Sequence, residues 1–447
     1  MKEDLTQGPV IKTMLRFAVP MIFGNLLQQC YNIADTLIVG RFLGAGALAA
    51  VGSAFSLMTF LTSILLGLAM GSGTVFSIRF GQKDQLGLKE GILASFVLLS
   101  IVTALLNSAV FMGLDWIIWI LRTPANLVAM MREYLSVIFI GLAGIFLFNF
   151  FTSLLRSLGN SVVPLLFLAV SAVLNIALDL WFVAGLNRGA AGAAEATVIS
   201  QYVSGIGIAV YTRIKYPELL RRDKKVRFRL SRVKEITGFS ALTCLQQSIM
   251  NLGILMVQGL VNSFGTTIMA AFAAAVKIDA FAYLPVQDFG NAFSIFTAQN
   301  YGAKQTERIK KGIRAALTAS VAFSLMVSFC VFVFAKPLMT LFINAEETAV
   351  IEEGVRYLHI EGAFYFLIGI LFLFYGLYRA LAKPGMSVVL TIASLGIRVA
   401  LAYALSAIPA FGIAGIWWSV PIGWLLADVL GTVYYFVKRK SLLRGGL

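Results

Sequence analysis

Long apolar runs separated by short polar stretches constrain the fold of this chain more than any other feature. A helix needs about 20 apolar residues to cross the hydrocarbon core of a bilayer, and the sequence contains twelve runs of that order. Apolar residues make up 59% of the chain and charged residues 13%, too little polar surface for a water-soluble fold. The runs also lack the short alternation of barrel strands. The sequence therefore predicts an all-α integral membrane protein with spans at residues 13–39, 48–78, 88–112, 128–155, 162–184, 190–212, 233–262, 268–295, 312–335, 353–380, 387–409 and 411–437.

The two halves of the chain repeat each other. Residues 156–158 (Arg-Ser-Leu) correspond to 379–381 (Arg-Ala-Leu), and at nearly the same separation 80–83 (Phe-Gly-Gln-Lys) correspond to 301–304 (Tyr-Gly-Ala-Lys). With six spans each, both repeats begin and end on the same side of the membrane, a parallel repeat typical of transporters that rock around a central site. We expect an N-terminal lobe (1–220, first six spans) and a C-terminal lobe (221–447, last six), joined by a basic cytoplasmic linker at about 213–234.

The basic residues indicate the orientation in the membrane. Most of the 36 Lys and Arg residues lie at the termini or in even-numbered loops, so the positive-inside rule places both termini in the cytoplasm. The basic run from Arg213 to Lys234 is expected to face lipid headgroups rather than nucleic acid. Lys2, Glu3 and Asp4 lead directly into the first span, which we expect to insert the protein without cleavage. These features suit a multi-pass protein of a bacterial cytoplasmic membrane.

The cysteine and histidine content argues against redox, metal and nucleophilic chemistry. Three cysteines lie far apart within apolar runs, so no disulfide framework is expected. His359 is the only histidine, and no metal, haem or nucleophile–base set can be built around it. The chain also lacks a GxxxxGK[ST] run that would bind ATP. We expect no cofactor other than a coupling ion, because uphill transport would have to use an ion gradient.

Two carboxylates interrupt the apolar runs of the first half. Asp35 lies in the first span and Asp179 in the fifth, whereas the repeat positions of the second half hold Val257 and Ala402. An Asp at the bilayer centre costs roughly 2.5–3.5 kcal/mol on insertion scales and usually has a function. No Lys or Arg lies centrally in the spans of the first half. We therefore expect the ionisable chemistry in that half.

Neutral polar side chains accompany these carboxylates. Asn175 lies four residues before Asp179, which places both on one helix face. Asn149 and Thr197 add an amide and a hydroxyl in the fourth and sixth spans. Each could instead be an interhelical hydrogen bond, worth about 0.6 kcal/mol. Together they favour a proton or sodium site, with Na⁺ held by Asp35, Asn175, Asp179 and Thr197 and no other metal.

Pro20 interrupts the hydrogen bonding of the first span. Its ring removes the backbone bond to the carbonyl of Arg16 and favours a kink. Protonation of Asp35 could change that bend, and a static packing kink is the alternative.

Several segments carry a family resemblance, in the same order along essentially the whole chain. They are NIADTLIVGRFLGAGALAAVGS, RSLGNSVVP, NIALDLWFVAGLNRGAAGAAEATVISQ and AQNYGAKQ. With the twofold repeat they resemble the multidrug and toxic compound extrusion (MATE) family. The resemblance implies two six-helix lobes around a V-shaped central cleft. It also implies secondary antiport, in which entry of H⁺ or Na⁺ drives export of amphipathic, often cationic, small molecules.

The resemblance also implies which residues couple the ion. One branch of the family carries its essential acids in the seventh and tenth spans, where this chain has Gln246, Gln247 and the apolar stretch 366–374, which argues against a site in the C-terminal lobe. Members with an N-terminal site have functional groups that match Asp35, Asn149, Asn175, Asp179 and Thr197, and a proline in a bending helix that matches Pro20.

The side chains that contact substrate are less well specified. Met and aromatic side chains suit polyspecific cavities because they repack around different shapes, although most such residues lie in the core or face lipid. The candidates for lining the cleft are Gln28, Met58, Met250, Met256, Phe281, Tyr283 and Asp288.

Charged residues also lie inside later spans. Lys277, Asp279, Asp288 and Arg398 have opposite signs, so mutual ion pairing is expected, with Asp288 lining the cleft as the alternative. Glu195 in the sixth span is expected near the outer interface, and a role in binding substrate or protons is its alternative.

Two other functions are compatible with parts of this pattern. A flippase for a lipid-linked glycan or another lipid would use the same fold, but its pyrophosphate needs cations in the cleft, and only Lys277 and Arg398 are central. An intramembrane enzyme would need a nucleophile or metal set that the chain lacks. We therefore expect a non-enzymatic efflux transporter that acts as a monomer, with small-molecule substrates and membrane lipids as its partners.

Overall fold

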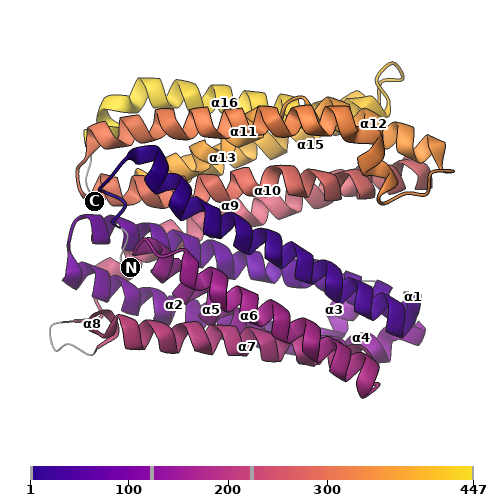
Figure 1. The fold of residues 1–447 in the computed structure, drawn as a ribbon, viewed down its shortest axis with the longest axis horizontal. Coiled ribbons are helices and arrows are strands. Elements are labelled where there is room, and N and C mark those ends of the chain that lie inside the picture. The colour runs from indigo at the N-terminus through magenta and orange to yellow at the C-terminus, as the bar shows by residue number, and fades with distance from the viewer. Residues whose placement is uncertain (1–3, 121–124, 222–225, 445–447) are drawn as a thin grey trace. The chain divides into compact units, whose positions relative to one another are not determined.

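The computed structural model describes residues 4–120, 125–221 and 226–444, and these residues are almost entirely helical (Figure 1). The α-helices are α1 (Val10–Gly81), α2 (Gln85–Met112), α3 (Leu114–Ile120), α4 (Val128–Ile138), α5 (Leu142–Ser157), α6 (Val162–Asp179), α7 (Gly189–Lys215), α8 (Pro217–Leu220), α9 (Leu230–Asn262), α10 (Thr266–Gly302), α11 (Thr306–Thr340), α12 (Thr348–Gly362), α13 (Tyr365–Ala380), α14 (Pro384–Thr391), α15 (Ile397–Ser406) and α16 (Ile413–Arg444). Between them lie the 3₁₀ turns η1 (Ala125–Leu127) and η2 (Phe139–Gly141) and the π-helical turns η3 (Leu180–Gly185) and η4 (Ile392–Gly396).

The helices account for all the predicted membrane spans. Eleven segments are long and apolar enough to cross a bilayer, and α12 with α13, bent by 51°, makes up a twelfth. Helix α1 holds the first two spans, which separate at Gly44, where φ is 83°. Glycine adopts that conformation without the steric cost that a Cβ brings. The prediction of an all-α membrane protein with twelve spans is confirmed.

The contacts between residues group the chain into two compact units. The first unit holds Phe23–Cys244 with the N-terminal residues up to Asp4, and the second holds Leu5–Ile22 and Leu245–Leu447. The chain thus leaves the second unit inside α1, after Ile22, and returns to it inside α9, after Cys244. The boundary between the lobes that the sequence predicts lies in the loop between the repeats. The boundaries between the two units lie instead in the interior of α1 and α9.

Within the first unit, small residues let α1 and α9 pack at backbone distance. A Cβ added to Gly67 would lie 2.5 Å from the Cα of Cys244, and one added to Gly71 would lie 2.5 Å from the Cα of Ser240. The hydroxyl groups of Ser72 and Ser240 are 3.0 Å apart. This spacing of small residues is the pattern that brings membrane helices into close contact. Helix α7 packs against α4, α5 and α6 in the same unit.

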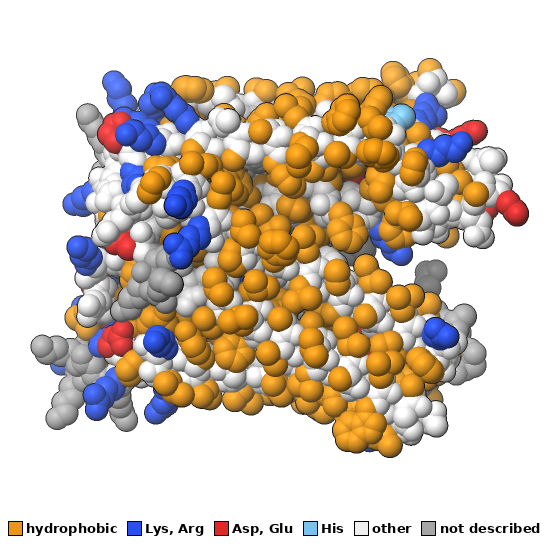
Figure 2. Space-filling view, viewed as in Figure 1, with side chains coloured by type: hydrophobic (Ala, Val, Ile, Leu, Met, Phe, Trp, Pro, Cys, Tyr) orange, Lys and Arg blue, Asp and Glu red, His pale blue; other side chains and the backbone are white. Residues whose placement is uncertain are grey.

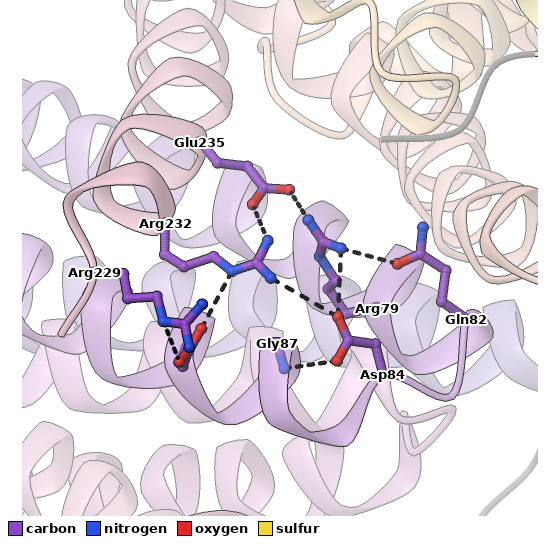
Figure 3. A network of polar contacts seen from close by, with 8 residues as sticks. Arg79, Gln82, Asp84, Gly87, Arg229, Arg232 and Glu235 are labelled. Atoms are coloured by element: carbon purple, nitrogen blue, oxygen red, sulfur yellow. Dashed lines mark hydrogen bonds and ion pairs between the residues drawn. The ribbon is translucent and has the colours of Figure 1, made fainter. Parts of the chain in front are cut away.

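A network of charged side chains joins α1, α2 and α9 at one end of the first unit (Figure 3). Arg79 contacts Glu235 at 2.6 Å, and Arg232 contacts Glu235 at 3.0 Å. Arg232 also reaches Glu90 at 3.4 Å, while Asp84 accepts a hydrogen bond from the backbone N–H of Gly87 at the start of α2. These contacts therefore hold the start of α9 against α1 and α2.

The second unit is built around α10, which packs against α11, α12 and α13. Helices α10 and α13 approach closely because Gly376 faces the carbonyl oxygen of Gly290, 2.5 Å from where its Cβ would lie. Trp417 of α16 stacks on Phe272 with a ring separation of 5.5 Å and donates to Glu353 at 2.7 Å.

Described residues near both ends of the chain lie at the same end of the second unit. Arg308, in the first turn of α11, donates to the carbonyl oxygens of Gln7 and Gly8, each at 2.6 Å. The nearby Thr306 donates to the carbonyl oxygen of Leu443 at 3.3 Å. Lys and Arg side chains gather at this end, whereas apolar side chains cover the length of the helices (Figure 2). The cytoplasmic location of the termini remains a prediction.

Candidate ion-coupling site

Four of the five predicted ion-coupling residues come together in the first unit. Asp35 lies in α1, Asn175 and Asp179 on one face of α6, and Thr197 in α7. Asp179 is 0% exposed and Asn175 2%, although both occupy a strongly apolar span. Asp179 is the last residue of α6 before the π-helical turn η3. Asn149 is half-buried in α5, and no described contact joins it to the other four.

The two carboxyl groups are the central feature of this site. Those of Asp35 and Asp179 lie next to each other, and each acts on the other more strongly than any other ionisable group does. Neither oxygen of Asp179 accepts a well-formed hydrogen bond from the described residues. The amide of Asn175 donates to Thr197 Oγ1 at 3.3 Å, and Thr197 in turn donates to the carbonyl oxygen of Ala193 at 3.1 Å.

Two tyrosines complete the surroundings of the carboxyl pair. Tyr31 lies one turn before Asp35 in α1, and the buried Tyr134 belongs to α4. Both tyrosines interact with the two carboxyl groups. Sequence reasoning did not identify them, because a tyrosine in an apolar helix gives no signal that separates a site residue from a core residue. The site offers two carboxyl groups, an amide and hydroxyl groups, which are oxygen-rich ligands for a proton or Na⁺.

The comparisons with known proteins identify the family of this chain. The MatE family profile matches residues 20–181 and 241–404, once in each half of the chain. The chain belongs to the MATE family of multidrug efflux transporters. It is 30% identical over 449 residues to the "Probable multidrug resistance protein YpnP" of Bacillus subtilis (strain 168), covering 99% of this chain and 98% of that protein.

A more distant relative and a solved structure also match over nearly the whole chain. The "Multidrug export protein MepA" of Staphylococcus aureus (strain NCTC 8325 / PS 47) is 25% identical, over 98% of this chain and 96% of that protein. A solved MATE transporter in an outward-facing conformation shares the fold, with a TM-score of 0.92 at 23% identity over 99% of this chain and 98% of that one. Members of the MATE family are transporters and not enzymes, so this chain has the architecture of a transporter.

Pro20 of this MATE family member lies close to the point where α1 passes from one unit to the other. The helix is continuous through Pro20, and the non-helical backbone in α1 is at Gly44 instead. Pro20 belongs to the second unit and Asp35 to the first. The role of Pro20 as the hinge of a bending helix, which the resemblance implies, remains a prediction.

The residues predicted to line the substrate cleft differ in exposure. Met58 and Asp288 are buried, at 8% and 7% exposure, whereas Gln28, Met256 and Phe281 are exposed. Met250 and Tyr283 are partly buried. Gln28 and Met58 belong to the first unit and the other candidates to the second. A cleft lined by all seven remains a prediction.

The second unit of this MATE protein has its own buried acids. Asp279 accepts hydrogen bonds from the hydroxyl groups of Tyr357, at 2.6 Å, and Tyr365. Glu361 of α12 lies beside it, at 5% exposure, and Arg398 supplies the positive charge that acts on both acids. Sequence reasoning missed Glu361, although a carboxylate close to an apolar run was the signal that had identified Asp35.

Two expectations about the other charges can be compared with the structure. The mutual pairing expected of the charged residues in the second half is not seen for Lys277 in the described part of the chain. Its side chain is exposed and lies 5.9 Å from the centre of the Phe342 ring. Glu195 forms an ion pair with Arg188 at 2.7 Å, at the start of α7, as suits a residue near an interface.

Proposed function

We propose that this MATE transporter exports amphipathic, often cationic, small molecules in exchange for H⁺ or Na⁺ bound at Asp35 and Asp179. The observation that carries the proposal is an adjacent pair of carboxyl groups, Asp179 buried and Asp35 half-buried, without a cationic partner among the described residues. Two unit charges 4 Å apart repel by about 4 kcal/mol at an effective dielectric constant of about 20. A proton or a sodium ion relieves that repulsion, so an ion is an integral part of the site.

The location of Asp35 provides a route from ion binding to movement. Asp35 lies in α1, the helix that passes between the two units after Ile22. Binding or release of the ion changes the net charge of the pair and therefore the stability of α1 in its position against α6. A site of this kind biases the equilibrium between conformations only if its ion affinity differs between them.

The relatives support the substrate class. YpnP and MepA carry names that refer to multidrug resistance and multidrug export. A pyrophosphate-bearing lipid is less suitable as a cargo, because Lys277 is exposed beside Phe342 and the charge of Arg398 acts on two buried acids. We further propose a monomer in a bacterial cytoplasmic membrane, with both termini inside the cell.

The proposal is tested by transport of a fluorescent lipophilic cation in vesicles that contain purified protein. A proton gradient and a sodium gradient are imposed separately on the wild type, Asp35→Asn and Asp179→Asn. Asp115→Asn is the matched control, since Asp115 is exposed and pairs with Arg132 outside the site. We expect one of the gradients to drive export, and both site variants to bind the cation but lose gradient-driven export. Normal export by both site variants would overturn the proposed site.

A further inference from the structure

Helix α16 carries a carboxylate that has no role in the proposed coupling site. Asp428 lies near the middle of the span Ile413–Leu443, in the second unit. Its side chain is 6% exposed, and both carboxylate oxygens are buried without a hydrogen-bond partner among the described residues. A charged carboxylate in this position is unfavourable unless an ion or a proton accompanies it.

Hydroxyl groups from three other elements lie together, and one of them interacts with Asp428. The hydroxyl of Tyr375 in α13 faces the hydroxyl groups of Thr391 in α14 and Ser394 in η4, and it interacts with the Asp428 carboxylate. Helix α16 approaches η4 closely, because a Cβ at Gly423 would lie 2.5 Å from the carbonyl oxygen of Ser394. A cluster of three hydroxyl groups is thus formed by α13, α14 and η4, and α16 brings the Asp428 carboxylate to its Tyr375 member.

The backbone at this place has the features of a binding site. Ser394 lies in η4, a π-helical turn. Such turns are rare in proteins, and those that occur are often found at functional sites. The hydroxyl of Thr391 already donates to the carbonyl oxygen of Ser387 at 2.9 Å, and Ser387 donates to the carbonyl oxygen of Tyr375 at 3.0 Å. The Thr391 oxygen therefore presents lone pairs, which can accept a hydrogen bond or coordinate a cation.

Charged groups on the elements that pack against α16 have other partners. Glu353 in α12 accepts a hydrogen bond from Trp417, and Arg379 in α13 donates to Ser294 and Asn291. Arg398 in α15 acts on Asp279 and Glu361. No charged group in the described part of the chain acts appreciably on Asp428. An ion from outside the protein is the remaining way to neutralise it.

We propose that Asp428, with the hydroxyl groups of Tyr375, Thr391 and Ser394, forms a second site for a monovalent cation, H⁺ or Na⁺. Oxygen donors of this kind suit a proton or a hard cation and not a soft metal. The site is separate from the carboxyl pair of the first unit and is not part of the repeated plan, because the repeat position in the first half is Gly205. Its occupancy stabilises the packing of α16 against η4.

Binding of radioactive sodium to full-length protein tests the sodium form of this site. Asp35→Asn/Asp179→Asn serves as the background, so that the proposed coupling site contributes nothing and its failure does not affect the result. For a site that takes Na⁺, the expected result is saturable sodium binding in this background, its loss on addition of Asp428→Asn, and its retention on addition of Asp115→Asn. Loss of binding in Tyr375→Phe and Ser394→Ala gives the same information should Asp428→Asn fail to fold.

An infrared titration of the same variants tests the proton form. For a site that takes a proton, the expected result is a carboxylic-acid band that disappears in alkaline solution and is absent from Asp428→Asn, and no sodium binding that depends on Asp428. The proposal is overturned if Asp428→Asn changes neither sodium binding nor any titrating carboxyl band. It is also overturned if the band persists at every pH in the wild type, because the proton would then be a permanent part of the structure.

Discussion

Thr197 illustrates how a single hydroxyl orients the candidate coupling site. Its Oγ1 accepts a hydrogen bond from the Asn175 amide and donates to the carbonyl oxygen of Ala193. The Asn175 amide is thereby oriented, and its Oδ1 is buried without a partner in the described part of the chain. That oxygen is available to a proton donor or to Na⁺.

Removal of this hydroxyl should weaken ion binding. Thr197→Val keeps the size of the side chain but removes the acceptor for Asn175, and a hydrogen bond of this kind contributes about 0.5–1.5 kcal/mol. We expect the ion concentration for half-maximal transport to rise about two- to tenfold, as measured by initial export rates at varied ion concentration.

Two controls accompany this prediction. Thr197→Ser retains the hydroxyl and should behave as the wild type does. Thr212→Val removes a hydroxyl of the same helix that donates to the carbonyl oxygen of Ile208, away from the carboxyl pair. Equal ion dependence in Thr197→Val and Thr212→Val would show that Thr197 does not orient the site.

At the scale of the elements, the contact between α1 and α9 depends on the absence of side chains. A Cβ at Gly71 would lie 2.5 Å from the Cα of Ser240 and 2.7 Å from the carbonyl oxygen of Phe239. We therefore expect Gly71→Ala to push the helices apart and to lower the free energy of unfolding by about 1–3 kcal/mol, the usual cost of overpacking. Thermal unfolding in detergent measures this change.

Gly238 provides the matched control for Gly71. It lies in α9, and a Cβ at Gly238 would meet nothing within 4 Å. Alanine is more favourable than glycine in a helix by roughly 0.5–1 kcal/mol, so Gly238→Ala should leave stability unchanged or increase it. A Gly71→Ala protein that is as stable as Gly238→Ala would contradict the close approach of α1 to α9.

The charged network of Figure 3 makes a second prediction for the elements. Glu235 of α9 lies between Arg79 and Arg232 and is largely buried, with 16% of its side chain exposed. We expect Glu235→Gln to lower stability by about 1–3 kcal/mol, because two guanidinium groups lose their shared carboxylate. Thermal unfolding again gives the measurement.

An exposed ion pair provides the comparison for this network. Glu307 pairs with Lys310 at 2.6 Å, but 77% of its side chain is exposed. Glu307→Gln should produce no measurable change, because water screens such pairs. If both substitutions had equally small effects, the network would not hold α9 to α1 and α2.

At the scale of the whole molecule, the position of Gly8 and Leu443 at one end of the second unit makes the orientation testable. Helix α11 starts beside Gly8 and Leu443 and runs to Thr340 as an apolar span, so we expect the segment that follows it on the opposite side of the membrane. In a chain with its native cysteines replaced by serine, we expect a membrane-impermeant thiol reagent to label Asn344→Cys in intact cells. Ser441→Cys should react only after permeabilisation. The reverse pattern would place the termini outside.

Hydrophobicity and length alone determined the twelve spans. The apolar runs predicted the spans because no other structure satisfies backbone hydrogen bonds in lipid. The same reasoning identified Asp35 and Asp179, since a carboxylate inside an apolar membrane span is energetically costly whichever side of the helix it lies on. It missed Glu361 and Asp428, which carry the same signal, because comparison of the repeats directed attention to the first half.

Only the tertiary structure decided which side chains face one another. Lys277 and Asp279 are two residues apart in α10, yet Lys277 is exposed and Asp279 is buried beneath two tyrosines. Tyr134 became a neighbour of the carboxyl pair through the packing of α4 in the first unit. Hydrophobicity places a helix in the membrane, but lipid is as apolar as most of its side chains. The face that each helix turns inward is therefore set by close packing and by hydrogen bonds between helices.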